Sequence, residues 1–118
     1  GGEKLFPFPM ETPIVKSTVD LVQKNLADEN FRVEELAAAM SISRESLYLR
    51  IKRETGMDTT TFIRTIRLWE GRRMLERNDL SISEVAYAVG FRHPYYFSRK
   101  FKEEFGRLPS EVLRQKNN

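Results

Sequence analysis

Apolar residues recur along most of this chain at the spacing of an α-helix. The first run places apolar side chains at i, i+4, i+7 and i+11, which is one face of a helix. These positions are Val15, Val19, Val22 and Leu26. Thr12 supplies an N-cap residue, and Pro13 fills the first turn, where its missing N–H costs nothing. The pattern therefore predicts a helix that begins at Pro13.

Six more helices are predicted beyond this one. They cover residues 33–40, 44–54, 60–77 and 82–89, then His93-Pro94 to Gly106, and a last helix from Pro109. Ser43 caps the 44–54 helix and Gly56 stops it, while Ser81 and Glu84 form an S-x-x-E capping box. On the 60–77 helix the expected buried residues are Phe62, Ile63, Ile66, Met74 and Leu75. No useful stretch alternates with the period of a strand, so the predicted fold is all-α with seven helices.

The first eleven residues break this pattern. Phenylalanine and leucine alternate there with prolines and show no helical period. Gly1-Gly2 with no initiator methionine is typical of a cloning remnant. We therefore expect residues 1–11 to be a linker or remnant, followed by one domain over residues 12–118.

The chain also resembles itself. A shift of 49 residues matches Leu36 to Val85, Ala37 to Ala86 and Ile42 to Phe91. A shift of 50 matches Leu47 to Phe97, Ile51 to Phe101, Lys52 to Lys102, Glu54 to Glu104 and Gly56 to Gly106. Each copy is a short helix, a tight turn and a longer helix that ends in glycine, which is the pattern of a helix-turn-helix. The two copies cover about 33–56 and 82–106, and the helix at about 60–77 connects them.

The outward face of the longer helix in each copy carries the candidate chemistry. If Leu47 and Ile51 point inward, the first copy exposes Arg44, Glu45, Tyr48, Leu49 and Lys52. If Phe97, Phe101 and Phe105 form the core stripe, the second copy exposes Tyr95, Ser98, Arg99 and Lys102. Arginine can pair with a guanine edge, glutamate can accept from a cytosine amine, and leucine suits a thymine methyl group. Two exposed tyrosines in corresponding regions argue against a face that serves only solubility.

Charge is distributed unevenly along the chain. Residues 1–43 hold four basic and seven acidic groups, whereas residues 44–118 hold 16 basic and 10 acidic groups. Only four of those 16 are lysines, and arginine is the better partner for phosphates and guanine edges. A basic field confined to part of a small domain favours a polyanionic partner. The predicted phosphate contacts are Arg44, Arg50, Lys52, Arg64, Arg67, Lys100 and Lys102, with helix N-termini near Val33 and Ile82 adding backbone donors.

Composition excludes several classes of protein. There is no cysteine and the only histidine is His93, so disulfide frameworks, thiol catalysis and multi-histidine or cysteine-ligated metal sites are excluded. No apolar run approaches the ~18–20 residues of a membrane span, and no signal peptide is evident. We expect a soluble, cytoplasmic domain that needs no metal or cofactor and makes no membrane contact.

These motifs resemble the DNA-binding domain of the AraC/XylS family of bacterial transcription regulators, over about Thr12 to Arg114. The most specific stretches are ISEVAYAVGF, YYFSRKFKEEFG and LPS around the second copy, with SISRESLY and FIRTIRLWEGRRML matching the first copy and the connecting helix. The resemblance implies a homeodomain-like pair of helix-turn-helix subdomains whose recognition helices enter successive major-groove segments of double-stranded DNA. By alignment, the implied base contacts are Glu45, Tyr48 and Leu49 in the first copy and Pro94, Tyr95 and Arg99 in the second. About 18 residues of connecting helix give ~27 Å, which suits reading helices near one DNA turn (~34 Å) apart.

Four residues or segments depart from the family pattern. Arg32 replaces a serine-type cap, which predicts a less firmly fixed helix start. Gly71 replaces an alanine in the connecting helix, at a cost of roughly 0.8–1 kcal/mol unless close packing requires it. His93 occupies a cap position and is expected to cap the helix or touch phosphate. Val112-Leu113-Arg114 lacks the usual tyrosine-arginine pair, which leaves the packing of the last helix open.

The resemblance also implies partners outside this segment. Family members attach this domain to a sensor, so we expect a regulatory domain upstream of residue 1, as in a hybrid two-component regulator, and RNA polymerase is a further candidate partner. Enzyme function is not predicted, because a Ser-His-Asp arrangement would have to use His93 and no glycine-rich phosphate loop is present. RNA is disfavoured, because rigid helices fit a deep A-form major groove poorly. The alternative is an all-helical protein-interaction adaptor, whose binding would be insensitive to salt.

Overall fold

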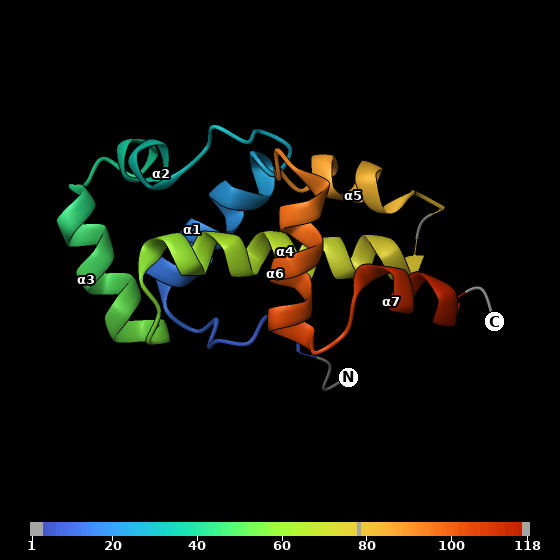
Figure 1. Cartoon of the computed structure of the whole chain (residues 1–118). Coiled ribbons are helices and arrows are strands. Elements are labelled where there is room, and N and C mark those ends of the chain that lie inside the picture. The colour runs from blue at the N-terminus through green and yellow to red at the C-terminus, as the bar shows by residue number, and fades with distance from the viewer. Residues whose placement is uncertain (1–3, 78, 117–118) are drawn as a thin grey trace. The chain divides into compact units, whose positions relative to one another are not determined.

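The architecture is all-α, as predicted. A computed structural model describes residues 4–77 and 79–116, and over these it contains seven helices and no strand. The helices are α1 (Pro13–Lys24), α2 (Val33–Ala39), α3 (Arg44–Thr55), α4 (Thr59–Arg77), α5 (Ile82–Ala88), α6 (Pro94–Phe105) and α7 (Pro109–Lys116), shown in Figure 1. Gly1 and Gly2, which were assigned to a remnant, lie outside the described residues. None of the helices described is long and apolar enough to cross a membrane.

Two compact units divide the chain. Unit 1 contains α1, α2, α3 and the first part of α4, up to residue 66. Unit 2 contains residues 27–29 and everything from residue 67 onward, that is, the rest of α4 with α5, α6 and α7. The helix α4 is continuous through the boundary between them (Figure 1). Each predicted helix-turn-helix therefore belongs to one unit.

The core of unit 1 is built from the predicted helical faces and from the N-terminal segment. Val15, Val19 and Val22 are buried on α1, whereas Leu26, the last residue of the predicted stripe, lies beyond the helix and is half-buried. Phe6 and Phe8 are also buried: their rings stack at 5.4 Å, and Phe8 contacts Phe62 at 4.9 Å. Residues 1–11 were expected to be a linker or remnant, and two of them, Phe6 and Phe8, have rings that the core of unit 1 shields from water.

The core of unit 2 is dominated by phenylalanine. Phe97 and Phe101 on α6 are fully buried, and Val85 of α5 packs in the same core. Gly71 on α4 is required there, because a Cβ at this position would lie 2.9 Å from the edge of the Phe97 ring. The set of buried residues on α4 lacks one predicted member, because Met74 is half-buried. Leu68, which was not predicted, is buried.

The internal repeat is visible in the backbone of both turns. The Ile42 N–H donates to Ala37 O at 3.2 Å, and at the matching position the Phe91 N–H donates to Ala86 O at 2.9 Å. The residue before each donor has positive φ, 56° at Ser41 and 85° at Gly90. Both turns thus make one left-handed residue, and the first copy does so without glycine.

The longer helix of each copy ends in the same way. Gly56 and Gly106 take left-handed φ values of 77° and 73° and donate to Lys52 O and Lys102 O, respectively. A left-handed residue without a Cβ closes a helix at low cost, which explains why glycine stands at both positions. The glycine stops read from the sequence are confirmed.

The N-terminal caps of the helices agree with the sequence prediction at some positions and differ at others. Ser43 Oγ accepts from the Ser46 N–H, and Ser81 and Glu84 form the predicted reciprocal capping box. Arg32 makes no side-chain cap, but the Glu35 carboxylate accepts from the Arg32 N–H at 3.0 Å and supplies half of a box. His93 also makes no capping hydrogen bond, so the capping role expected for it is not found.

The last helix, whose packing the sequence left open, does form as α7, and it packs with Pro109 and Val112 buried.

Candidate nucleic-acid interface

The outer face of α3 exposes the residues that the sequence selected for base reading. Leu47 and Ile51 are completely buried, so α3 is fixed with its opposite side toward solvent. On that side Glu45 is exposed, Tyr48 is 42% exposed and Leu49 is 66% exposed. Two large exposed hydrophobic side chains on a helix whose inner face is fully packed are typical of a binding surface.

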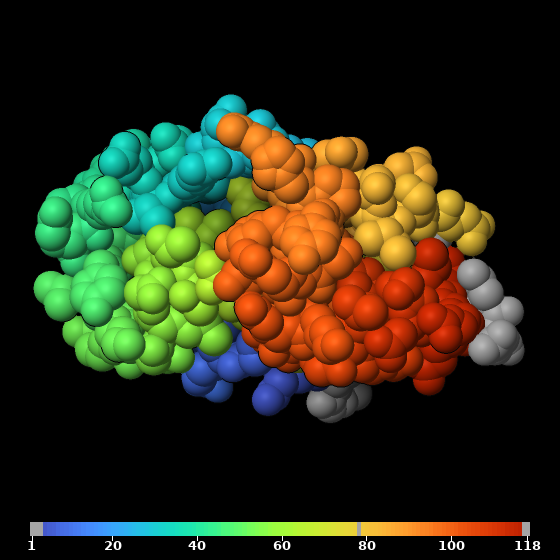
Figure 2. Space-filling view, viewed as in Figure 1, coloured from blue at the N-terminus to red at the C-terminus, as the bar shows by residue number. Residues whose placement is uncertain are grey.

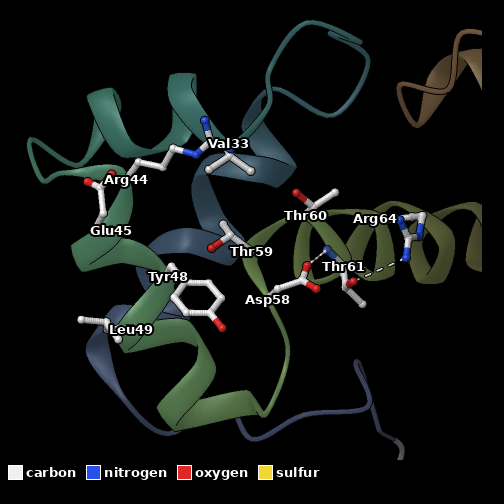
Figure 3. Close-up of a pocket in the computed structure, with 10 residues that line it drawn as sticks. All are labelled: Val33, Arg44, Glu45, Tyr48, Leu49, Asp58, Thr59, Thr60, Thr61 and Arg64. Carbon is white, nitrogen blue, oxygen red and sulfur yellow. Dashed lines mark hydrogen bonds between the residues drawn. The ribbon is translucent and has the colours of Figure 1, made fainter.

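This face continues into a groove with the start of α4. Figure 3 shows the residues that line it, which come from α2, α3, α4 and the loop before α4. They are Val33, Arg44, Glu45, Tyr48, Leu49, Asp58, Thr59, Thr60, Thr61 and Arg64. The groove has a volume of about 780 Å³ and combines apolar contact area with two guanidinium groups. Glu45 and Asp58 add two carboxylates to this lining, so the groove offers a hydrophobic surface and charges of both signs on one side of unit 1.

The sequence analysis did not select Asp58, Thr60 or Thr61, although all three line this groove. Asp58 caps α4 by accepting from the Thr61 N–H at 2.8 Å, and Arg64 donates to Thr61 Oγ1 at 3.5 Å (Figure 3). Hydrogen bonds that the Asp58 carboxylate accepts from the Thr61 backbone N–H and hydroxyl lower the pKa of the Asp58 carboxyl below its usual value. An aspartate three residues before a threonine, two residues after a helix-stopping glycine, is the sequence signal that could have identified this cap.

The outer face of α6 presents a second set of candidates in unit 2. Tyr95 is 79% exposed and Arg99 is exposed, whereas Ser98 and Pro94 are half-buried. Tyr95, Ser98 and Arg99 line a shallow depression together with Lys102, Glu103 and Leu108. The side chains of α6, orange in Figure 2, form part of the surface of unit 2. Of the residues selected on this helix, Tyr95, Ser98, Arg99 and Lys102 therefore share one accessible face.

The candidate phosphate-contacting side chains differ in their exposure and in whether they already pair with a neighbouring residue. Arg50, Lys52, His93 and Lys102 are exposed. Three others are exposed or half-buried and are held by a neighbour: Arg44 pairs with Glu34 at 3.2 Å, Lys100 with Glu103 at 3.1 Å, and Arg64 with Thr61. Lys52 also donates to Gly56 O at 3.0 Å. These contacts are local and solvent-accessible, so a phosphate can compete for the cations.

Arg67 is a correction to the predicted set. Only 6% of this residue is exposed, and its guanidinium donates to Val89 O at 2.9 Å and to Asp28 O at 3.1 Å. Both carbonyls belong to unit 2, so Arg67 connects the segment at 27–29 to the end of α5. A buried guanidinium with carbonyl partners stabilises the fold and cannot reach a phosphate, and the sequence could not separate it from the exposed arginines.

Comparison with curated proteins identifies relatives that are much longer than this chain. Histidine kinase P4 of Formosa agariphila is 34% identical over 102 residues, which cover 86% of this chain and 7% of that protein. The transcriptional activator RhaS of Pectobacterium carotovorum is 31% identical over 101 residues, which cover 86% of this chain and 36% of that protein. The chain thus spans a minor part of the length of these relatives.

Solved structures show the same fold. The DNA-binding domain of the transcriptional factor AdpA, solved in complex with a target DNA, superposes with a TM-score of 0.78 at 30% identity, covering 89% of this chain and 93% of that one. A regulator from Chromobacterium violaceum with an AraC-type DNA-binding domain gives a TM-score of 0.80 at 25% identity, covering 88% and 92%. A family model described as a helix-turn-helix domain matches residues 36–115, from α2 into α7. The chain belongs to the AraC family of helix-turn-helix domains.

Proposed function

We propose that this domain binds double-stranded DNA sequence-specifically in transcription regulation, with α3 and α6 reading successive major-groove segments. The observation that carries the proposal is the repeated unit: two helix-turn-helix copies with matching turns and helix ends each expose base-reading side chains on the longer helix. A helix of this kind fits the major groove of B-DNA, where every base pair presents a distinct pattern of donors and acceptors. The DNA-bound relative and the family membership support the same function.

The two copies offer different chemistry to the bases. On α3, Glu45 can accept a hydrogen bond from a cytosine amino group, and Leu49 can contact a thymine methyl group. On α6, Arg99 can donate two hydrogen bonds to a guanine edge, with Tyr95, Ser98 and Pro94 beside it. Because the two faces are not duplicates, the preferred site should be asymmetric rather than palindromic.

Backbone contacts would come from the cations around these faces. Arg50, Lys52, His93 and Lys102 are exposed and can approach phosphates directly. Arg44, Arg64 and Lys100 would exchange a protein oxygen for a phosphate oxygen, which is a charge-assisted interaction of at least similar strength. Such contacts position the protein without reading sequence and make affinity dependent on salt.

The test compares two substitutions on α6. Duplexes selected from a random library at two salt concentrations give the preferred site, and Arg99→Ala is then measured on matched and singly altered sites. We expect a loss of about 1–3 kcal/mol confined to one base pair, with relaxed preference there. The matched control Lys102→Ala should weaken all sequences alike and reduce the salt slope by roughly 0.9, the contribution of one phosphate.

Two results would count against this function. Equal losses for Arg99→Ala on matched and scrambled sites would make Arg99 a backbone contact. Failure of the isolated domain to select any duplex in dilute buffer, together with salt-insensitive binding to a protein partner, would favour the adaptor alternative. In the proposed role the domain is the output end of a longer cytoplasmic regulator, with a sensor domain upstream and RNA polymerase as a further candidate partner.

A further inference from the structure

We infer that Tyr96 is a positioning residue for base readout: its ring orients the Arg99 guanidinium on the outer face of α6. This inference rests on the proposed function, because it assigns how one reading side chain is held. The Arg99 guanidinium carbon lies 5.4 Å from the centroid of the Tyr96 ring, within the range of a cation–π contact. Tyr96 was not selected by the sequence analysis, and it does not line the depression that contains Arg99.

The Tyr96 ring is itself anchored to the core of unit 2. It packs against Phe91, with centroids 5.9 Å apart and the planes inclined by 46°. Phe91 is buried and meets Phe97 edge-on at 5.2 Å, and Phe97 is completely buried. A continuous series of rings therefore runs from the core to the exposed arginine. A side chain held by such a series has less rotational freedom to lose when it binds.

The neighbouring cation does not make this contact redundant. Lys100 Nζ lies 5.7 Å from the same ring centroid, but Lys100 is also paired with Glu103 at 3.1 Å. Arg99 has no such partner among the contacts recorded for the described residues, and the Tyr96 ring is the group that contacts it. The planar guanidinium stacks on an aromatic face more readily than an ammonium group does, and its fork is the group that pairs with guanine.

The first copy of the repeat lacks this arrangement and provides an internal comparison. The 50-residue shift matches Tyr96 to Ser46 and Arg99 to Leu49. Ser46 donates its backbone N–H to the Ser43 side chain, and it carries no ring that could support Leu49 from this position. An apolar leucine contacts a methyl group through its shape and needs no oriented hydrogen bonds, so an aromatic support is present only where a directional side chain is used.

The experiment replaces Tyr96 with leucine and with phenylalanine. Tyr96→Leu removes the aromatic face, and we expect the preference for the base pair read by Arg99 to fall about two- to fivefold. Preference at the base pairs read by α3 and the salt slope should not change. Tyr96→Phe retains the ring and should behave as the wild type does. Tyr87→Leu is the matched control, since Tyr87 is an exposed tyrosine on α5 that lines neither the groove beside α3 nor the depression on α6.

A second measurement needs no DNA. Proton chemical shifts of the Arg99 side chain should carry a ring-current shift that is lost in Tyr96→Leu and kept in Tyr96→Phe. Unchanged base preference in Tyr96→Leu, or an equal loss of affinity on all sequences, would overturn the role of Tyr96 while leaving the proposed function intact. A wild-type domain with no sequence preference would instead overturn the proposed function, and with it the role in readout, even if the ring-current shift were present.

Discussion

Gly71 shows how a single residue can be set by a packing partner rather than by its own helix. Glycine within a helix normally costs about 0.8–1 kcal/mol relative to alanine. Here the position faces the edge of Phe97, and that ring is held by Phe91 and Phe101 on its other sides. The loss of helix propensity at Gly71 therefore accompanies a close contact between α4 and α6, because a side chain at this position would collide with Phe97.

We expect Gly71→Ala to destabilise the domain in spite of its better helix propensity. Overpacking of a core typically costs about 1–3 kcal/mol, which is more than the propensity gain. Chemical unfolding of the variant measures the net effect, with Glu76→Ala on the exposed side of the same helix as the control. A more stable Gly71→Ala would mean that Phe97 can move aside at little cost.

Arg67 and Arg50 allow a matched comparison of a buried and an exposed arginine. Arg67→Met leaves the buried Val89 O without its Arg67 donor, and a buried unpaired group costs about 1–3 kcal/mol. Arg50→Met should hardly change the free energy of unfolding but should reduce the salt slope of DNA binding by roughly 0.9. Denaturant titration and binding at several salt concentrations measure both effects. The assignment fails if Arg67→Met lowers the salt slope without loss of stability.

At the scale of elements, caps and stops define where each helix of the repeat begins and ends. Both longer helices end on a left-handed glycine, and α4 begins with the Asp58 cap. Asp58 also lines the groove beside the proposed reading face of α3, so the same residue that starts α4 shapes the candidate interface.

The charge on Asp58 makes this cap dependent on pH. Because the folded state lowers the pKa of Asp58, its ionised form stabilises the fold above the ordinary aspartate pKa, and this contribution is lost as the pH falls through the folded-state pKa. Asp58→Ala should cost about 0.5–2 kcal/mol at neutral pH. Asp58→Asn retains a neutral cap, so any stability advantage of the wild type over it should shrink below about pH 4. Unfolding curves at pH 7 and in acid measure this, and an advantage that grew in acid would contradict the assignment.

At the scale of the whole molecule, the proposed function requires both units to contact one duplex at the same time. The units share α4, a continuous helix of 19 residues. If each unit reads one major-groove segment, inserting about five base pairs between the two segments rotates one of them by half a turn. We expect such an insertion to reduce affinity to that of a site with one segment scrambled. Gel-shift titration measures this, and equal affinity for both spacings would show that the units bind independently.

Some features of this protein could be predicted from the sequence because they depend on residues close together in the chain. The helical periods, the Ser43 and Ser81 caps, the Gly56 and Gly106 stops and the repeat are all of this kind. The outward faces of α3 and α6 follow from the same periods, since burial of one side of a helix exposes the other.

Other features were decided only by the tertiary structure. These features depend on segments that lie far apart in the sequence, such as Arg67 and Asp28, which are 39 residues apart. They are the burial of Phe6 and Phe8, the need for glycine at position 71, the burial of Arg67 and the place of Asp58 in the groove. The local pattern around an arginine is the same whether a carbonyl or water receives its hydrogen bonds. Local hydrogen bonding therefore sets which residues form helices, whereas packing between distant segments determines which side chains remain free to bind.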